Sequence, residues 1–361
     1  MKEYPVVKDP DSISSPGLWV DKAALQRNLA QMISDIGGES HIDRLRPHVK
    51  THKMTEVIKL QVTAGILKCK AATPAEAKMA AEGGARDILI AHQLVGPKIA
   101  QVARLMVDFP EVTFSTVTDD VSAFSSLASQ LEGIGIWIDV DCGMHRSGIE
   151  FGAGLDKLRD KIESTDGVEF RGLHVYDGHL HDPSLESRRA DALAIIESVR
   201  EYLASRKGTT VVGGGTPTFG IWAGETEWEC SPGTTVFWDC GYGENYPDLE
   251  YEVAAGLITR VISKPGVNQI CLDLGHKSIS AEMELSRRVF FPQITDYKLV
   301  GQSEEHLVLE VPDASEFEVG DVFTAIPRHV CPTVALHAYA SILENGIPTG
   351  EIWKVTSRDR L

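Results

Sequence analysis

Short apolar runs rich in β-branched residues alternate with helix-like segments over the first two thirds of the chain. Between most runs, apolar residues recur at helical spacing; in 186–203, for example, Ala192, Ile196 and Val199 share one face. Eight strand–helix pairs within about 200 residues predict an α/β fold of the closed (β/α)8 type, a TIM barrel, because such a barrel typically takes ~250 residues. The predicted strands are Arg44–Lys50, Lys68–Ala72, Asp87–His92, Thr113–Val117, Gly135–Asp141, Phe170–Tyr176, Thr209–Gly213 and Thr235–Cys240.

From Ala254 onward the pattern changes to strand-like runs joined by turns, with no helical segment of comparable length. This change predicts a second, all-β domain. We therefore expect a barrel over residues 17–253 and a β domain over residues 254–361, which residues 1–16 join. The predicted strands of the second domain are Leu257–Ile262, Gln269–Leu274, His306–Val311, Val322–Ile326 and Ile352–Thr356.

Charge and cysteine content narrow the class of protein. The 361 residues include 35 Lys plus Arg and 52 Asp plus Glu, a formal net charge of −17, which disfavours binding to nucleic acid. No apolar run approaches the ~18 residues of a membrane span, and the N-terminal sequence mixes charges and prolines where a signal peptide would be apolar. The six cysteines form no C-x-x-C pair. We expect a cytoplasmic protein that binds neither nucleic acid nor membrane.

The first predicted strand ends in the basic sequence Arg46-Pro47-His48-Val49-Lys50-Thr51-His52-Lys53. A lysine at the C-terminal end of a barrel strand points into the mouth of the barrel, where barrel enzymes carry their chemistry. Such local basicity is unusual in an acidic chain. We therefore expect Lys50 to be a catalytic lysine, with His48 beside it in the site.

Glycine-rich sequences follow predicted strands seven and eight. Glycines let backbone N–H groups approach an anion closely, and in barrels the loops after these two strands form a recurrent phosphate site. A phosphate at this place, with a lysine reaching in from strand one, predicts pyridoxal 5′-phosphate, whose aldehyde would form a Schiff base with Lys50. The predicted cofactor-binding residues in these loops are Gly214, Gly215, Thr216, Gly241 and Tyr242.

The ends of strands five and six supply further side chains. Arg146 follows strand five and is expected to face the pyridine nitrogen of the cofactor, whereas Tyr176 ends strand six and is expected to contact its ring. His179 and His181 lie just beyond, and a histidine that is neutral near pH 7 suits a catalytic base. We also expect an electropositive pocket formed by Arg46, His48, Lys50, His52, Lys53 and Arg146.

A histidine and a cysteine two residues apart stand near the C-terminus, in Arg328-His329-Val330-Cys331-Pro332-Thr333. In an extended segment, residues i and i+2 project to the same side, so His329 and Cys331 can bind one metal ion. Imidazole and thiolate favour zinc over magnesium or calcium. Two protein ligands leave positions open for water and substrate, as a catalytic metal requires.

Taken together, these residues resemble the fold-type III pyridoxal-phosphate enzymes, specifically the group of D-threonine aldolase and D-serine dehydratase. The sequence around Lys50 resembles the cofactor-lysine motif of that group, and His329-Val330-Cys331 resembles its metal motif. The resemblance covers nearly the whole chain. It implies an alanine racemase-like barrel followed by a β domain, a divalent metal such as zinc or manganese, a D-amino acid substrate and a homodimer.

The resemblance leaves two reactions open. D-Serine dehydratases of this group carry His-x-Cys, as this chain does, whereas D-threonine aldolases carry His-x-Asp; the segment Gly172–Asp182 is nevertheless most similar to bacterial aldolase relatives. In retro-aldol cleavage, His179 or His181 would take the β-hydroxyl proton, and glycine and an aldehyde would form. In dehydration, including that of 3-hydroxyaspartate, Lys50 would take the Cα proton. We favour the aldolase; an amino acid racemase and a non-catalytic cofactor carrier are weaker alternatives.

Overall fold

The computed structural model describes residues 4–360, which form two compact units. The described residues of the barrel unit are 30–50, 55–233 and 359–360, and those of the β unit are 4–29, 51–54 and 234–358. The predicted domain boundaries, 17–253 and 254–361, stay a prediction. None of the helices in residues 4–360 is long and apolar enough to cross a membrane.

Strands and helices alternate through the barrel unit, whereas strands predominate after α9. The first half of the chain contains β1 (Gly17–Asp21), α1 (Lys22–Asp35), α2 (Thr55–Thr63), β2 (Lys68–Ala71), α3 (Pro74–Glu82), β3 (Asp87–Ile90), α4 (Pro97–Asp108), β4 (Thr113–Thr118), α5 (Val121–Ala128), β5 (Ile134–Val140), α6 (Ala153–Glu163) and β6 (Val168–Val175). The second half contains α7 (Leu185–Leu203), β7 (Thr210–Gly213), α8 (Phe219–Glu225), β8 (Glu229–Cys230), α9 (Cys240–Asn245), β9 (Ala255–Gly266), β10 (Gln269–Leu272), β11 (Val289–Phe290), β12 (Lys298–Gln302), β13 (Leu307–Glu310), β14 (Val322–Pro327), α10 (Val330–Val334), β15 (Tyr339–Glu344) and β16 (Ile347–Lys354).

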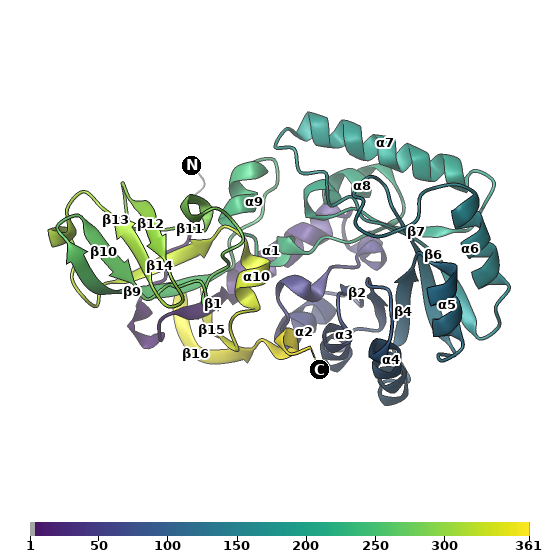
Figure 1. Cartoon of the computed structure of the whole chain (residues 1–361), viewed down its shortest axis with the longest axis horizontal. Helices are drawn as coiled ribbons and strands as arrows, with labels where there is room; N and C mark the ends of the chain where they lie inside the picture. The colour runs from purple at the N-terminus through teal and green to yellow at the C-terminus, as the bar shows by residue number, and fades with distance from the viewer. Residues whose placement is uncertain (1–3, 361) are drawn as a thin grey trace. The chain divides into compact units, whose positions relative to one another are not determined.

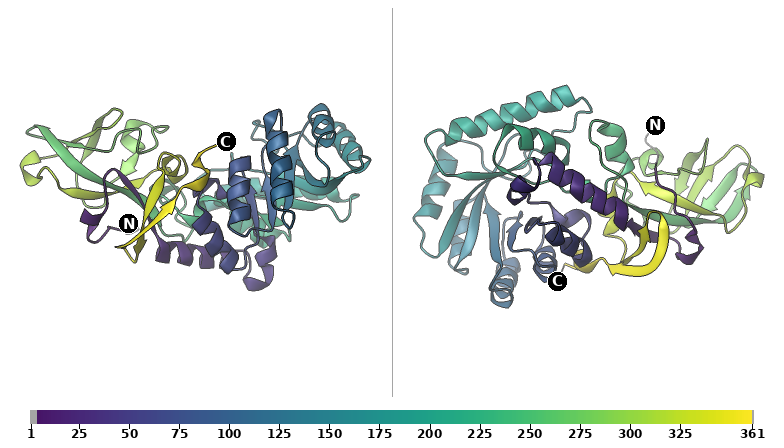
Figure 2. Two further views of the ribbon diagram at one scale, coloured as in Figure 1. Left: turned by 90° about the horizontal axis from the view of Figure 1, so that it is seen from below. Right: turned by 180° about the vertical axis from the view of Figure 1, so that it is seen from behind.

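The barrel unit is built on a parallel sheet of the order β2-β3-β4-β5-β6-β7-β8, with helices α3 to α7 around the outside of the strands (Figure 1, Figure 2). The seven parallel strands form a half-barrel. Pro74 and Pro97 begin α3 and α4, where a missing N–H is harmless. Buried side chains on four strands form the interior: Leu89, Val117, Trp137 and Val212.

The first predicted strand, Arg44–Lys50, is not a regular strand in the structure. Leu45 makes a single parallel bridge to Cys230 of β8, and His48 makes one to Lys70 of β2. Pro47 lies between them and has no N–H to donate to a ladder, although its carbonyl accepts from the Lys70 N–H at 2.9 Å. The segment therefore still links the two ends of the sheet.

The prediction of an eighth barrel strand at Thr235–Cys240 is wrong. Those residues comprise the end of a 3-10 turn, Thr234–Val236, a short connection at 237–239 and the first residue of α9, all in the β unit. The true β8 is only Glu229–Cys230, paired to β7 through Val212 and Gly213. A run rich in β-branched and aromatic residues was outweighed by tertiary context, as strand propensity often is.

The β unit is organised around a sheet of the order β12-β13-β10-β9-β1-β15-β16, with β14 paired to β9. All five strands predicted after Ala254 overlap strands of this sheet; β1, β12, β15 and β11, which pairs with β14, were missed. The N-terminal segment joins the same unit: the Val7 N–H donates to Thr324 Oγ1, and the Lys8 N–H donates to the Gly346 carbonyl.

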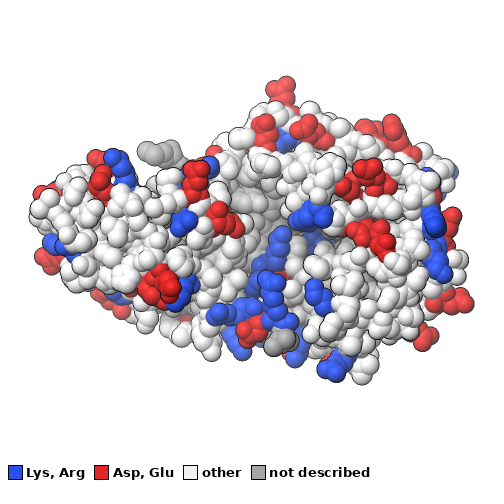
Figure 3. Space-filling view, viewed as in Figure 1, with Lys and Arg blue, Asp and Glu red and all other residues white. Residues whose placement is uncertain are grey.

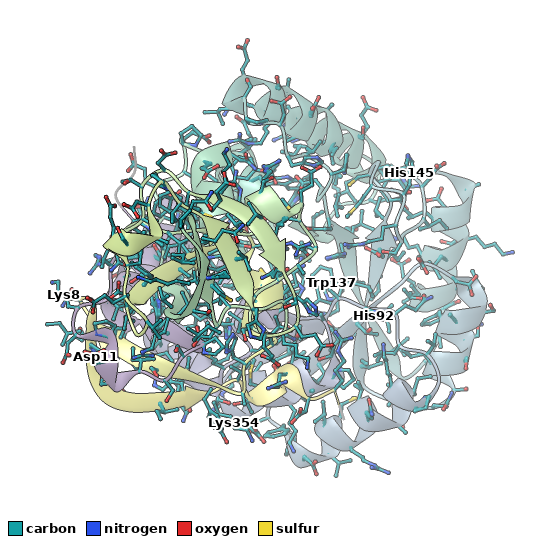
Figure 4. All side chains as sticks on the ribbon, turned by 60° about the vertical axis from the view of Figure 1, so that its left-hand side comes forward. Lys8, Asp11, His92, Trp137, His145 and Lys354 are labelled. Carbon is teal, nitrogen blue, oxygen red and sulfur yellow. The ribbon has the colours of Figure 1, made fainter. Side chains whose placement is uncertain are left out.

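Acidic side chains spread over the α7 side of the barrel unit in the face seen in Figure 3. On the inside of the same unit the pattern differs, because basic groups are buried there. Trp137, labelled among the barrel strands in Figure 4, has the Arg46 guanidinium 5.7 Å from its ring centre.

Candidate active site

Lys50 lies in a short 3-10 turn, Val49–Thr51, directly after the bridged segment. The turn is fixed locally, since the Lys50 N–H donates to His48 Nδ1 at 3.3 Å. The side chain of Lys50 is half-buried, and its Nζ lies 5.8 Å from the centre of the Tyr176 ring. The structure thus places three of the predicted site residues, His48, Lys50 and Tyr176, in one neighbourhood.

The Tyr176 ring has three basic side chains around it. Besides Lys50, the Lys70 Nζ lies 5.2 Å and the Arg146 guanidinium carbon 5.0 Å from the ring centre. Within residues 4–360, neither Lys50 nor Arg146 forms an ion pair with a carboxylate. Two such cations in a protein of net charge −17 favour an anionic ligand.

Glycines give the Tyr176 ring its space. A Cβ on Gly178 would lie 2.3 Å from a ring carbon and 2.6 Å from the phenolic oxygen, and one on Gly215 would lie 3.1 Å from the ring. Any side chain at Gly178 would therefore displace the ring. Gly178 is therefore needed to keep this tyrosine where the cations meet, and Gly215 leaves space beside the ring.

The loop that carries Arg146 is fixed by Asp141. One carboxylate oxygen of Asp141 accepts the N–H groups of Gly143 and His145 at 3.0 Å each, and the other contacts the His145 ring at 2.9 Å. His145 itself points outward and is exposed (Figure 4). His145 therefore helps to fix the loop through its contacts with Asp141, whereas Arg146 faces Tyr176.

Lys70, His174 and Asp139 form a buried chain that the sequence interpretation missed. Lys70 Nζ lies 3.4 Å from His174 Nε2, and His174 Nδ1 lies 2.7 Å from an Asp139 oxygen. Burial raises the pKa of Asp139, but its hydrogen bond with His174 and the nearby charges outweigh burial and lower it. Burial also lowers the pKa of Lys70, to about 7, and Lys50 adds to the effect. The sequence feature that could have pointed to Lys70 is the two-residue period of β2, which puts Lys68 and Lys70 on one side of the strand.

The glycine turn after β7 lies where it was predicted. Gly214 has a left-handed backbone with φ +73°, and the Gly215 N–H donates to Thr218 Oγ1 at 3.1 Å. The loop after the true β8 meets it, since the Gly233 N–H donates to Thr216 Oγ1 at 3.0 Å. The two loops that can hold a phosphate are therefore 213–218 and 231–233.

Gly241 and Tyr242 do not follow a barrel strand. They lie in α9 of the β unit, where the Tyr242 N–H donates to Asp239. A Cβ on Gly241 would meet the Arg328 carbonyl at 2.3 Å, so this glycine permits close backbone packing. Their assignment to the phosphate loop followed from the misplaced eighth strand. Ser231, Pro232 and Gly233 take that position.

His179 and His181 differ in exposure. His179 is half-buried beside Gly143, and its Nδ1 has no hydrogen-bond partner among residues 4–360. His181 is exposed. Both lie in the loop after β6, as predicted, and their role as base stays a prediction.

His329 and Cys331 meet as side chains, but not in the predicted extended geometry. His329 has extended backbone and caps α10, and Cys331 lies in the first turn of that helix, where Pro332 is tolerated. Cys331 Sγ lies 3.2 Å from Thr51 Oγ1 and 3.6 Å from Thr234 Oγ1. His329 Nδ1 contacts Glu282. Burial lowers the pKa of His329, but hydrogen bonding to Cys331 and Glu282 raises it to about 9.

The predicted electropositive pocket is partly wrong. Arg46 is fully buried and ion-paired to Asp87 and Glu229, because it fills the barrel interior. His52 and Lys53 belong to the β unit, and burial lowers the pKa of His52 to about 3, so its ring is neutral. The basic groups that gather at Tyr176 are Lys50, Lys70 and Arg146.

Two family models match the chain. The model described as "Alanine racemase, N-terminal domain" matches residues 20–239, and the model described as "Putative serine dehydratase domain" matches residues 254–343. The first covers more than half of the chain. Together with the half-barrel and its basic mouth, it defines an alanine racemase-like enzyme of fold type III.

Known relatives span almost the full length. A D-threonine aldolase from an Arthrobacter species is 29% identical over 96% of this chain and 93% of its own. A 3-hydroxy-D-aspartate aldolase from Paracoccus denitrificans (strain Pd 1222) is 30% identical over 98% and 94%. The crystal structure of D-threonine aldolase from Filomicrobium marinum is 26% identical, with a TM-score of 0.86 over 98% and 97%. The chain belongs to the pyridoxal-phosphate-dependent lyases of the D-threonine aldolase and D-serine dehydratase family.

Proposed function

We propose that the protein is a pyridoxal-phosphate- and divalent-metal-dependent lyase of D-β-hydroxy-α-amino acids, specifically a D-threonine aldolase that releases glycine and an aldehyde. The observation that carries the proposal is that one chain holds both donor sets: a lysine in a basic pocket and a histidine–cysteine pair. The full-length likeness to two aldolases supports this choice of reaction.

The pocket around Tyr176 fits pyridoxal phosphate. Lys50 would hold the aldehyde end, Arg146 and Tyr176 would contact the ring, and Gly214, Gly215 and Thr216 would face the phosphate with the loop 231–233. The absence of a Cβ at Gly215 leaves room beside the tyrosine ring. When bound, the cofactor supplies an aldehyde for the lysine amine and an electron sink for charge that develops on the substrate Cα.

The histidine–cysteine pair fits a divalent metal, for which we propose zinc or manganese. Glu282 holds Nδ1 of His329, which leaves Nε2 as the donor; such a carboxylate commonly orients a ligating histidine. No group of three or more His, Cys, Asp or Glu side chains in residues 4–360 forms a complete metal site. Open positions for water and substrate are what a catalytic metal needs. When bound, the metal supplies a Lewis acid for a substrate oxygen.

The chain's own residues would then handle charge and protons. Arg146 is a cation suited to an incoming carboxylate. His179 or His181 would take the proton of the β-hydroxyl as the Cα–Cβ bond breaks, and Cα later gains a proton to give glycine. Of the two histidines, we favour His179, because its Nδ1 is buried with no partner among the described residues.

A D-serine or D-3-hydroxyaspartate dehydratase is the second candidate. It is favoured by the serine dehydratase model over residues 254–343 and by Cys331 in the metal pair. In that reaction Lys50 would take the Cα proton and the β-hydroxyl would leave, so neither histidine would be needed as a base.

A product assay separates the two candidates. The metal-loaded holoenzyme is incubated with D-threonine and, separately, with D-serine, and products are measured by chromatography and ammonia release. Glycine plus acetaldehyde from D-threonine is the expected result. Keto acid plus ammonia as the only products would refute the aldolase and support the dehydratase.

We also propose that the enzyme is a cytoplasmic homodimer, which the resemblance to the family supports. Sedimentation velocity should give the mass of two chains at micromolar concentration, and the mass of one chain would contradict it.

A further inference from the structure

Lys70 is a second lysine in the basic pocket, and it is buried far more deeply than Lys50. Only 2% of its surface is exposed. Lys68, two residues earlier on β2, provides a contrast, because its Nζ is paired to Glu229 at 2.6 Å. Within residues 4–360, Lys70 has no such carboxylate partner, and its nearest polar contact is His174 Nε2 at 3.4 Å.

The hydrogen-bond chain fixes which atom donates. Asp139 also accepts from Ser147 Oγ at 2.9 Å, so its carboxylate is held by two donors and is the proton acceptor toward His174. Burial and Lys70 lower the pKa of His174, which leaves a neutral ring with its proton on Nδ1. Nε2 is then an acceptor, and the Lys70 amine is the donor.

The surroundings decide how readily this amine is protonated. Burial and the positive charges of neighbouring side chains disfavour the ammonium form, whereas nearby carboxylates favour it. The pKa of Lys70 is lowered to about 7, with burial as the largest cause. The titratable and charged groups around Lys70 are His48 on the bridged segment, Lys50 on the 3-10 turn, Asp139 on β5, Arg146 after β5, His174 on β6, and Tyr176 and Asp177 after β6.

We propose that Lys70 is an anion-binding residue of the cofactor pocket: His174 and Asp139 hold its buried amine beside Lys50 and Tyr176, where its ammonium form adds one positive charge to the pocket. The inference rests on the proposed function in one respect: it assumes that the pocket around Tyr176 is the cofactor site. Its consequence is that the pocket binds an anion more tightly at low pH than at high pH.

Inorganic sulfate tests this in the cofactor-free full-length protein, because sulfate keeps its double charge from pH 6.0 to 8.5. Binding is measured by calorimetric titration in the wild type, in Lys70→Met and in the matched control Lys68→Met. One added charge near a dianion in a partly screened pocket strengthens binding about tenfold. We expect about tenfold tighter binding at pH 6.0 than at pH 8.5 in the wild type and in Lys68→Met, and less than a twofold change in Lys70→Met.

An equal pH dependence in Lys70→Met and the wild type would overturn the inference, as would a wild type whose sulfate binding is flat or absent at both pH values. If Lys70→Met does not fold, Asp139→Asn replaces it. That change removes a negative charge that favours the ammonium form, so the midpoint of the sulfate profile should move to lower pH; an unmoved midpoint contradicts the role. A Lys70-dependent profile in a protein without lyase activity would keep this inference and refute the proposed function.

Discussion

Arg46→Met removes a buried guanidinium from the interior of the barrel unit. In the wild type its two terminal nitrogens donate to the Asp87 carboxylate at 2.8 and 3.0 Å, and Nε donates to Glu229 at 2.6 Å. The arginine side chain is fully buried. Methionine fills much of the same volume but leaves two partly buried carboxylates without their main partner.

The expected loss of the free energy of unfolding depends on the partners that Asp87 and Glu229 keep in the variant. Removing one member of a buried ion pair typically costs about 3–5 kcal/mol, because the other charge stays buried. Lys68 still contacts Glu229 at 2.6 Å and Arg171 still contacts Asp87 at 3.2 Å, so both carboxylates keep one partner. We therefore expect a loss at the lower end of that range, about 3 kcal/mol of the free energy of unfolding.

Urea unfolding of the cofactor-free protein at pH 7 measures this loss. The matched control is Arg86→Met in the same unit, whose ion pair with Glu111 at 3.4 Å is half exposed and should contribute less than about 1 kcal/mol. Equal losses for the two variants would refute the reasoning.

Burial raises the pKa of Asp87, but its bonds to Arg46 outweigh burial and lower it. The stabilisation from the Arg46–Asp87 pair is thus present above the unfolded pKa of about 4 and is lost as the pH falls further. The free energies of unfolding of the wild type and Arg46→Met should therefore converge in acid.

Three further predictions concern the rest of the molecule. Burial lowers the pKa of His52 to about 3, so below pH ~6.5 only the unfolded chain takes up this proton; between pH 6.5 and 5 the wild type should lose about 1.6 kcal/mol more stability than His52→Gln, as followed by urea unfolding of both, and equal losses would contradict the burial of this ring. Gly178→Ala should push the Tyr176 ring aside and weaken pyridoxal phosphate binding by about tenfold in an absorbance titration, a loss of ~1.4 kcal/mol, whereas Gly224→Ala, with open space around it, should leave binding unchanged. Exhaustive chelation should abolish activity that zinc or manganese restores, and Cys331→Ser should need a higher metal concentration for half activity; a fully active chelated enzyme would contradict the metal assignment.

The fold was predictable where the sequence pattern and the tertiary structure agree. Strands from Lys68 to Gly213 and the helix Leu185–Leu203 follow from periodicity, since each buries one face or both against its neighbours. The first and eighth barrel positions were not predictable in the same way. Pro47 prevents a regular ladder, and Glu229–Cys230 is too short to show a pattern, while Thr235–Cys240 has strand-forming residues in a turn.

The candidate site divides along similar lines. Lys50, Arg146 and Tyr176 were found because they stand at or just after the ends of predicted strands, and the structure brings them together. Lys70 was missed because a lysine inside a strand usually faces solvent; only the fold shows that it is buried beside His174. Gly241 and Tyr242 were assigned to the phosphate loop by counting strands, whereas the structure places them in α9 and places residues 231–233 after β8. The helix at Cys331 is signalled by Pro332, which is tolerated in a first helical turn.

The assignment of Lys50 as the cofactor lysine is tested most directly by borohydride reduction of the loaded protein. Reduction makes the bond between the lysine amine and the cofactor permanent, and peptide mass spectrometry then locates it. The structure places two amines near Tyr176, so the measurement discriminates between them. We predict that the pyridoxyl group is found on Lys50 alone. A pyridoxyl group on Lys70, or on no lysine of this pocket, would contradict the assignment.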